Sequence, residues 1–279
     1  MTSGKRMNET ATAPSDTDML NTTISGTGPT LTWAHGLMHS MDFESRTGWF
    51  HPECGSKVRR VRFDARGHGQ SPGSVDVAHY LWSAQAADML AIARAQSESS
   101  IALGGHSMGS ASALLAAMQA PDKVSCLILA TPPTAWRTRP AQIRRYRQMQ
   151  RIIEQRGLAS LVGLAAQNPA LPDWLLAAHP AHANASQQAL ATMQQGNLMA
   201  ILDAACQCDL PAPETLLQLR IPTLILGWRD DPIHPLETAE QLAAALPLAE
   251  LQIIDSAGAL QAWPSQIDDF VCRHAHSRL

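Results

Sequence analysis

The chain has 279 residues, of which 45% are hydrophobic and 16% are charged, and its formal net charge is −3. This length is enough for one large α/β domain or for a domain with an inserted subdomain, and the composition is typical of a soluble globular protein. No basic excess indicates a nucleic-acid partner, and no run of 18 apolar residues indicates a membrane span. Five scattered cysteines favour reduced thiols and a cytoplasmic location.

Apolar strand-like runs alternate with helical periodicity along most of the chain. We expect strands over residues 30–36, 57–67, 100–107, 124–130, 221–228 and 249–255, and helices over 77–96 and 108–120. Nearly continuous apolar strands that alternate with helices predict an α/β fold in which helices cover both faces of a mostly parallel sheet.

Two segments depart from this alternation. Residues 1–18 are polar and lack the apolar core of a signal peptide, so we expect a flexible N-terminal tail. The long stretch before residue 220 has no strand-like run and consists of helical segments separated by proline-containing breaks. It predicts an all-helical cap over 134–219, inserted into a core that is formed by residues 19–133 and 220–279.

The sequence "GHSMG" (residues 105–109) matches the pattern G-x-S-x-G. It lies between an apolar strand and a helix, which is the context that a nucleophile elbow requires. The serine of such an elbow sits on a strained turn, so the residues two positions away must be small. The N–H groups at the start of the following helix then point to where negative charge develops. Ser107 is therefore the candidate nucleophile.

With this motif the chain resembles the α/β-hydrolase superfamily over about residues 20–279. The resemblance implies an oxyanion loop at His35 and Gly36, with one N–H donor from Leu37 and a second from Met108. The segment "FDARGHGQS" (residues 63–71) is similar to a turn of the family's smaller esterases. That turn is structural in those enzymes, so we interpret its Asp64 and His68 as architecture.

The resemblance also implies an acid in the loop after the strand that follows the cap. This loop reads "GWRDDPIHP" (residues 227–235) and offers Asp230 and Asp231. The family's D-P-x-x-P ending aligns with Asp231, whereas counting from Gly227 favours Asp230. We select Asp231, because the two prolines constrain the turn more tightly than one glycine does.

The family places its catalytic histidine after the last strand, where this chain reads "SAGALQAWP" (residues 256–264). Gly258 and Pro264 fit the family pattern G-H-x-x-x-x-x-P, but Ala259 stands at the histidine position. A serine hydroxyl is a poor nucleophile without a neighbouring base. We therefore expect this form of the protein to be nearly inactive.

Three explanations remain open for Ala259: a deliberate His→Ala replacement that traps a ligand, a natural non-catalytic relative, or a base from elsewhere, such as His274 or His276. Because every other motif position is kept, the pattern favours the first. His234 lies in the loop of the acid, and we interpret it as loop structure or pocket wall and not as the base. His106 is interpreted as a packing residue.

The sequence predicts a serine hydrolase that cleaves a small-molecule ester, lactone or related acyl compound through an acyl-Ser107 intermediate, without a metal or cofactor. The alternatives are a non-catalytic small-molecule-binding protein, a carbon–carbon bond hydrolase and a cofactor-free haloperoxidase-like enzyme. A dehalogenase or epoxide hydrolase is disfavoured, because the elbow carries serine in place of aspartate. The candidate pocket residues are His35, Gly36, Met38, His39, Trp136 and Trp174.

Overall fold

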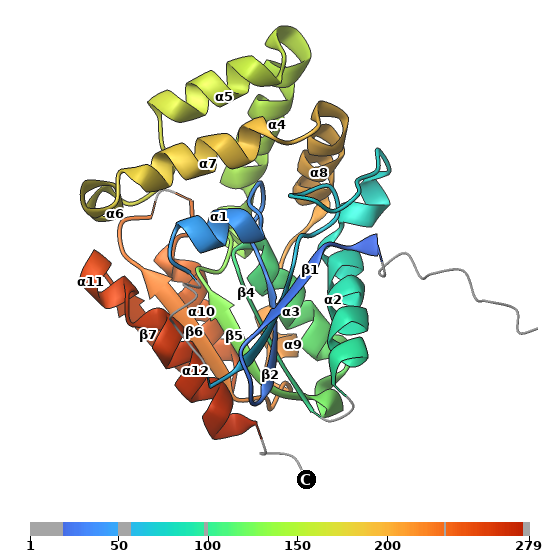
Figure 1. Cartoon of the computed structure of the whole chain (residues 1–279), viewed down its shortest axis with the longest axis vertical. Helices are drawn as coiled ribbons and strands as arrows, with labels where there is room; N and C mark the ends of the chain where they lie inside the picture. Colours follow the sequence, from blue (N-terminus) through green and yellow to red (C-terminus); the bar gives the residue numbers. More distant parts are fainter. Residues whose placement is uncertain (1–18, 50–56, 98–99, 232, 276–279) are drawn as a thin grey trace, which may run out of the picture.

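A seven-stranded sheet forms the centre of the protein (Figure 1). The computed structural model describes residues 19–49, 57–97, 100–231 and 233–275. The expected flexible tail, residues 1–18, lies outside the described residues. The strands are β1 (Thr22–Ser25), β2 (Thr30–Ala34), β3 (Arg59–Phe63), β4 (Ile101–His106), β5 (Val124–Ala130), β6 (Thr223–Trp228) and β7 (Ala249–Ile254).

The strand order is β1-β3-β2-β4-β5-β6-β7, and all pairs are parallel except β1 with β3. The expectation of a mostly parallel sheet is therefore confirmed, and all six predicted strands are present. The sequence analysis missed β1. All four residues of this edge strand are exposed, so it carries no apolar alternation that would mark it in the sequence.

Successive strand residues point to opposite faces of the sheet, and both sets are apolar in the central strands. Helices therefore cover both faces. Leu103 and Leu127 point to one face, where they pack in one core cluster with residues of α2 (Trp82–Gln96), α3 (Met108–Gln119) and α10 (Leu236–Ala245). Ala102 and Ile128 point to the other face, where α12 (Trp263–His274) packs. These two apolar layers hold the ends of the central strands in a fixed arrangement.

Between β5 and β6 the described chain contains helices and no strand. The elements are the short turns η4 (Trp136–Thr138) and α9 (Pro213–Leu216) and the helices α4 (Arg139–Arg156), α5 (Leu158–Gln167), α6 (Asp173–Ala178), α7 (Ala181–Ala191) and α8 (Gln195–Gln207). Helices α4 to α8, called the helical insertion below, lie beyond the carboxyl ends of the parallel strands (Figure 1).

The helical insertion packs on the core at α1 (Met41–Arg46). This short helix follows β2, and the sequence analysis did not expect it. Phe43 of α1 packs against Ala185 and Ala189 of α7. Ser40 caps α1, since its side chain accepts a hydrogen bond from the N–H of Phe43. The carboxyl ends of β2, β4 and β6 therefore open towards a space that α1 and the helical insertion enclose. No helix in the described part of the chain is long and apolar enough to cross a membrane.

Candidate active site

Ser107 occupies a strained turn between β4 and α3, with φ 52° and ψ −118°. A side chain has no room on either flanking glycine. A Cβ atom on Gly109 would lie 2.0 Å from the carbonyl oxygen of Ala34, and one on Gly105 would lie 2.5 Å from the same atom. The sequence thus folds into the tight strand-to-helix turn that exposes a nucleophile at the end of a strand.

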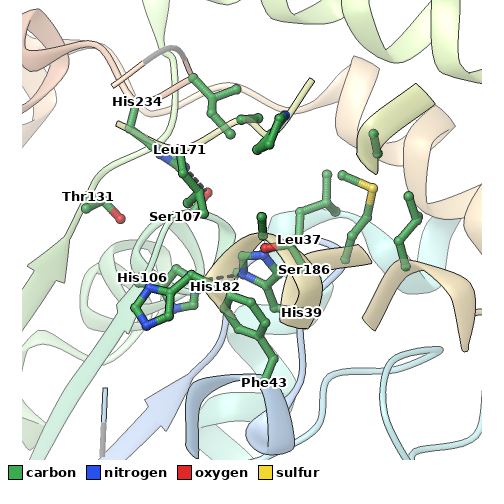
Figure 2. A pocket seen from close by; sticks show the side chains of 18 of the residues that line it. Leu37, His39, Phe43, His106, Ser107, Thr131, Leu171, His182, Ser186 and His234 are labelled. Atoms are coloured by element: carbon green, nitrogen blue, oxygen red, sulfur yellow. Dashed lines mark hydrogen bonds between the residues drawn. The ribbon is translucent and has the colours of Figure 1, made fainter. Parts of the chain in front are cut away.

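His234 lies directly against this serine. Its Nε2 atom is 2.8 Å from Oγ of Ser107, a hydrogen-bond distance (Figure 2). The expectation that Ser107 has no histidine partner is therefore wrong, and so is the interpretation of His234 as loop structure or pocket wall. The loop after β6 brings His234 to the elbow because β6 is separated from β4 by β5 alone, and the parallel strands end at the same edge of the sheet.

Asp231 orients this histidine from three residues away. Its Oδ2 atom is 2.7 Å from His234 Nδ1, and its Oδ1 atom accepts hydrogen bonds from the N–H groups of Ile233 and His234 at 2.7 and 2.9 Å. Oδ2 also accepts a hydrogen bond from the indole of Trp228. Burial raises the pKa of Asp231, but His234 and the hydrogen-bond donors outweigh burial, so the pKa lies below its ordinary value.

An ionised carboxylate can only accept hydrogen bonds, so the proton between Asp231 and His234 belongs to Nδ1 of the histidine. In the neutral imidazole with its proton on Nδ1, Nε2 accepts the hydrogen bond from the Ser107 hydroxyl. Asp230, the competing candidate for the acid, is exposed at the surface and has φ 59°. The chain therefore brings Ser107, His234 and Asp231 together and leaves Asp230 outside.

Ala259 lies in α11 (Ala257–Leu260), where its N–H donates to the capping side chain of Ser256 at 3.4 Å. The neighbouring Leu260 lines the cavity at Ser107, but Ala259 does not. His274 is also excluded as the base. The end of α12 contacts Ser100, which precedes β4, whereas Ser107 follows β4 at the opposite end of that strand. His276, the other candidate base, lies outside the described residues.

Of the two candidate oxyanion donors, Met108 directly follows Ser107, and Leu37 lines the same cavity as the serine. The backbone N–H groups of Leu37 and Met108 donate to no other described residue. Met38 has φ 60°, and its N–H donates to Nε2 of His68 at 3.2 Å. This contact supports the structural role assigned to His68, because it fixes the loop that carries Leu37.

A cavity of about 660 Å³ opens at Ser107 between the core and the helical insertion (Figure 2). Gly36, Met38 and His39 line this cavity, as does Leu37. Three other candidate pocket residues do not line it. His35 is buried behind the loop, where its Nε2 accepts from the N–H of Ala65.

The two tryptophans proposed for the pocket are held elsewhere by their indole N–H groups. Trp136 donates to the carbonyl of Pro211, and Trp174 donates to the carbonyl of Arg229. The sequence analysis missed other lining residues, among them Thr131, Tyr146, His182 and Ser186. Those from the helical insertion had no signal in the sequence, because their place at the cavity depends on how the helices pack over the core. Within the described ranges, no group of three or more His, Cys, Asp or Glu side chains could hold a metal ion.

The chain is similar to known hydrolases in sequence and in fold. The profile of the family described as "Serine aminopeptidase, S33" matches residues 29–260. Over 194 residues the chain is 27% identical to "Putative carbamate hydrolase RutD" of Klebsiella pneumoniae (strain 342), which covers 69% of this chain and 71% of that protein. Over 203 residues it is 29% identical to the protein of the same name in Rhizobium rhizogenes, with 71% and 74% covered.

Solved structures share the fold across nearly the whole chain. An esterase from Thermogutta terrifontis superposes with a TM-score of 0.76 at 21% identity and covers 92% of this chain and 94% of its own. The enol-lactonase from Burkholderia xenovorans LB400 superposes with a TM-score of 0.72 at 16% identity, with 90% and 95% covered.

Proposed function

We propose that this chain, which belongs to the serine aminopeptidase S33 family of α/β-hydrolases, is an active serine hydrolase of small-molecule esters, lactones or related acyl compounds. The observation that carries this proposal is the continuous hydrogen-bonded line from Ser107 through His234 to Asp231. It supplies the base that position 259 lacks. The same line argues against a non-catalytic binding protein, which has no need of a histidine directed at a strained serine.

In the proposed mechanism, His234 Nε2 takes the proton of the Ser107 hydroxyl while Oγ attacks the carbonyl carbon of the substrate. Asp231 stabilises the imidazolium that forms and keeps the ring in its orientation. The N–H groups of Leu37 and Met108 bind the oxyanion of the tetrahedral intermediate. His234 then protonates the leaving group, and an acyl-Ser107 intermediate remains. A water molecule, deprotonated by His234, hydrolyses this intermediate and releases the acid.

The cavity supports a small-molecule substrate. Its volume of about 660 Å³ lies within the usual range for ligand pockets, and apolar side chains such as Leu161, Leu190 and Trp228 form much of its wall. We propose that the helical insertion acts as the cap of this pocket. A carbamate is a second candidate substrate, favoured by the name of the RutD relatives, because its carbonyl is open to the same attack.

Hydrolysis of a series of 4-nitrophenyl esters with acyl chains of two to eight carbons tests the proposal. The unchanged protein should turn over at least one member, and Ser107→Ala should lower kcat/KM by several orders of magnitude. Rapid quenching followed by mass measurement should find the acyl group on the peptide that contains Ser107. The proposal fails if no ester is hydrolysed, or if Ser107→Ala retains the activity of the unchanged protein.

A further inference from the structure

A second series of hydrogen bonds leads from the core to the cavity. It involves none of Ser107, His234 and Asp231. Glu44 is fully buried, and its Oε1 atom accepts from the indole of Trp33 at 2.8 Å and lies 3.0 Å from Nδ1 of His106. Nε2 of His106 lies 3.1 Å from Nδ1 of His39, which lines the cavity (Figure 2). The chain of contacts thus ends on a histidine at the substrate pocket.

The charges at the buried end set the direction of these hydrogen bonds. Arg62 forms an ion pair with Oε2 of Glu44 at 3.2 Å. Burial raises the pKa of Glu44, but the hydrogen bond from His106 and the charge of Arg62 outweigh it and lower the pKa to about 2. The buried Glu44 carboxylate is therefore ionised. An ionised carboxylate only accepts hydrogen bonds, so Nδ1 of His106 donates to Glu44.

A neutral His106 that donates from Nδ1 to Glu44 has an unprotonated Nε2. Its contact with His39 then requires the proton on Nδ1 of His39. Burial, together with the neighbouring histidines, lowers the pKa of His39 well below its ordinary value, so this ring is neutral too. The ring is held in place by stacking on Phe43 at a centroid distance of 3.7 Å. Among the described residues, Nε2 of His39 has no hydrogen-bond partner.

We propose that His39 is a substrate-specificity residue: it presents Nε2 to the cavity as a fixed hydrogen-bond acceptor and selects substrates with an O–H or N–H donor near the scissile carbonyl. His39 and the candidate oxyanion donor Leu37 both line the cavity at Ser107. Glu44 and His106 are positioning residues that set the tautomer of His39. The inference rests on the proposed hydrolase function for its substrate, but the tautomer can be tested without any substrate.

The tautomer is measured by ¹⁵N NMR of the full chain labelled on its histidine rings at pH 7.5, with the signals of His39 assigned by their loss in His39→Leu. Nδ1 of His39 should carry the proton, and Nε2 should give the shift of an unprotonated ring nitrogen. A proton on Nε2 of His39 would overturn the proposal, because the ring would then be a donor.

Specificity is measured with matched esters that carry a hydroxyl at carbon 2, 3 or 4 of the acyl chain, its methyl ether, or a methyl group in its place. At one of these positions the hydroxyl ester should exceed both partners in kcat/KM by about tenfold, as expected for one hydrogen bond. In His39→Leu this ratio should fall to about one. His79→Leu removes a histidine of the turn η2 (Val77–Tyr80), which does not line the cavity, and should keep the ratio.

The outcomes separate this inference from the proposed function. If the esters are hydrolysed but the hydroxyl gives no advantage at any position, the role of His39 is wrong and the hydrolase proposal stands. If the methyl ether equals the hydroxyl ester, His39 donates and the proposal is overturned. If no ester in either series is hydrolysed, the proposed function fails, and the specificity role of His39 fails with it.

Discussion

His234 and Asp231 lie three residues apart on one turn, and Nδ1 of His234 is 2.7 Å from Oδ2 of Asp231. One loop after β6 therefore carries both the proposed base and the group that orients it. The turn after β7, where Ala259 lies, is left without a catalytic task. The order along the chain is still serine, acid, histidine, as expected for this fold. The interval between the acid and the histidine is shorter than the fold's usual one.

Replacing His234 with alanine should remove the base from Ser107 and lower kcat for any ester substrate by about 10⁴- to 10⁶-fold. The melting temperature should change little, because the side chain borders the cavity and Asp231 keeps its hydrogen bonds from Trp228 and from the backbone N–H groups. Steady-state kinetics and thermal unfolding measure both effects. Ala259→His is the matched variant and should leave kcat within about threefold of the unchanged protein. This is expected for a residue outside the group of Ser107, His234 and Asp231. A large gain in Ala259→His would contradict this assignment.

The acid is tested by two neighbouring amide substitutions. Asp231→Asn should lower kcat by about 10⁴-fold, because the amide no longer holds the proton on Nδ1 of His234. Asp230→Asn should have little effect, since the Asp230 side chain is exposed and contacts neither Ser107 nor His234. Kinetics of the two variants on the same ester give the comparison. Equal losses in both would show that the loop acts through its overall charge and not through one carboxylate.

The sequence predicted the sheet and the nucleophile because both rest on local patterns. The apolar runs of β4, β5 and β6 and the glycines around Ser107 follow from burial and steric limits that act within a few residues. His234 was missed for a different reason. Its role depends on where the loop after β6 ends in space relative to β4, and the expected place for a histidine after β7 directed attention to Ala259. The D-x-x-H spacing of Asp231 and His234 was the signal that could have found it.

Glu44 was also missed, because it stands in a polar-looking segment and its burial arises from tertiary contacts with Trp33, Arg62 and His106. Glu44→Gln should lower the free energy of unfolding by about 3–5 kcal/mol, since it removes the buried carboxylate that pairs with Arg62 and accepts hydrogen bonds from Trp33. Chemical denaturation provides the measurement. Glu240→Gln, on the exposed face of α10, is the control and should change stability by less than about 0.5 kcal/mol. Similar small losses in both variants would show that the ion pair contributes no stability.

Buried neutral histidines should make the fold sensitive to mild acid. Burial, together with the neighbouring His35, lowers the pKa of His68 from 6.5 to about 3. Between these two pH values the unfolded chain binds a proton at His68 and the folded chain does not. The contribution of His68 to the free energy of unfolding is therefore fully present above pH 6.5, and it decreases as the pH falls below 6.5. The slope from this one residue reaches about 1.4 kcal/mol per pH unit.

Urea unfolding of the unchanged protein and of His68→Gln at several pH values measures this slope. Below pH 6 the slope for the variant should be smaller by the equivalent of about one proton, and above pH 7.5 the two slopes should agree. Identical slopes below pH 6 would mean that His68 titrates alike in both states.

The central claim is that the chain with Ala259 is a complete serine hydrolase with His234 as its base. The most direct measurement is the rate at which a fluorophosphonate probe labels the unchanged protein, His234→Ala and Ala259→His, with the labelled peptide identified by mass. The account predicts rapid labelling of Ser107 in the unchanged protein and in Ala259→His, and almost none in His234→Ala. An unchanged protein that stays unlabelled, together with labelling that appears only in Ala259→His, would contradict it.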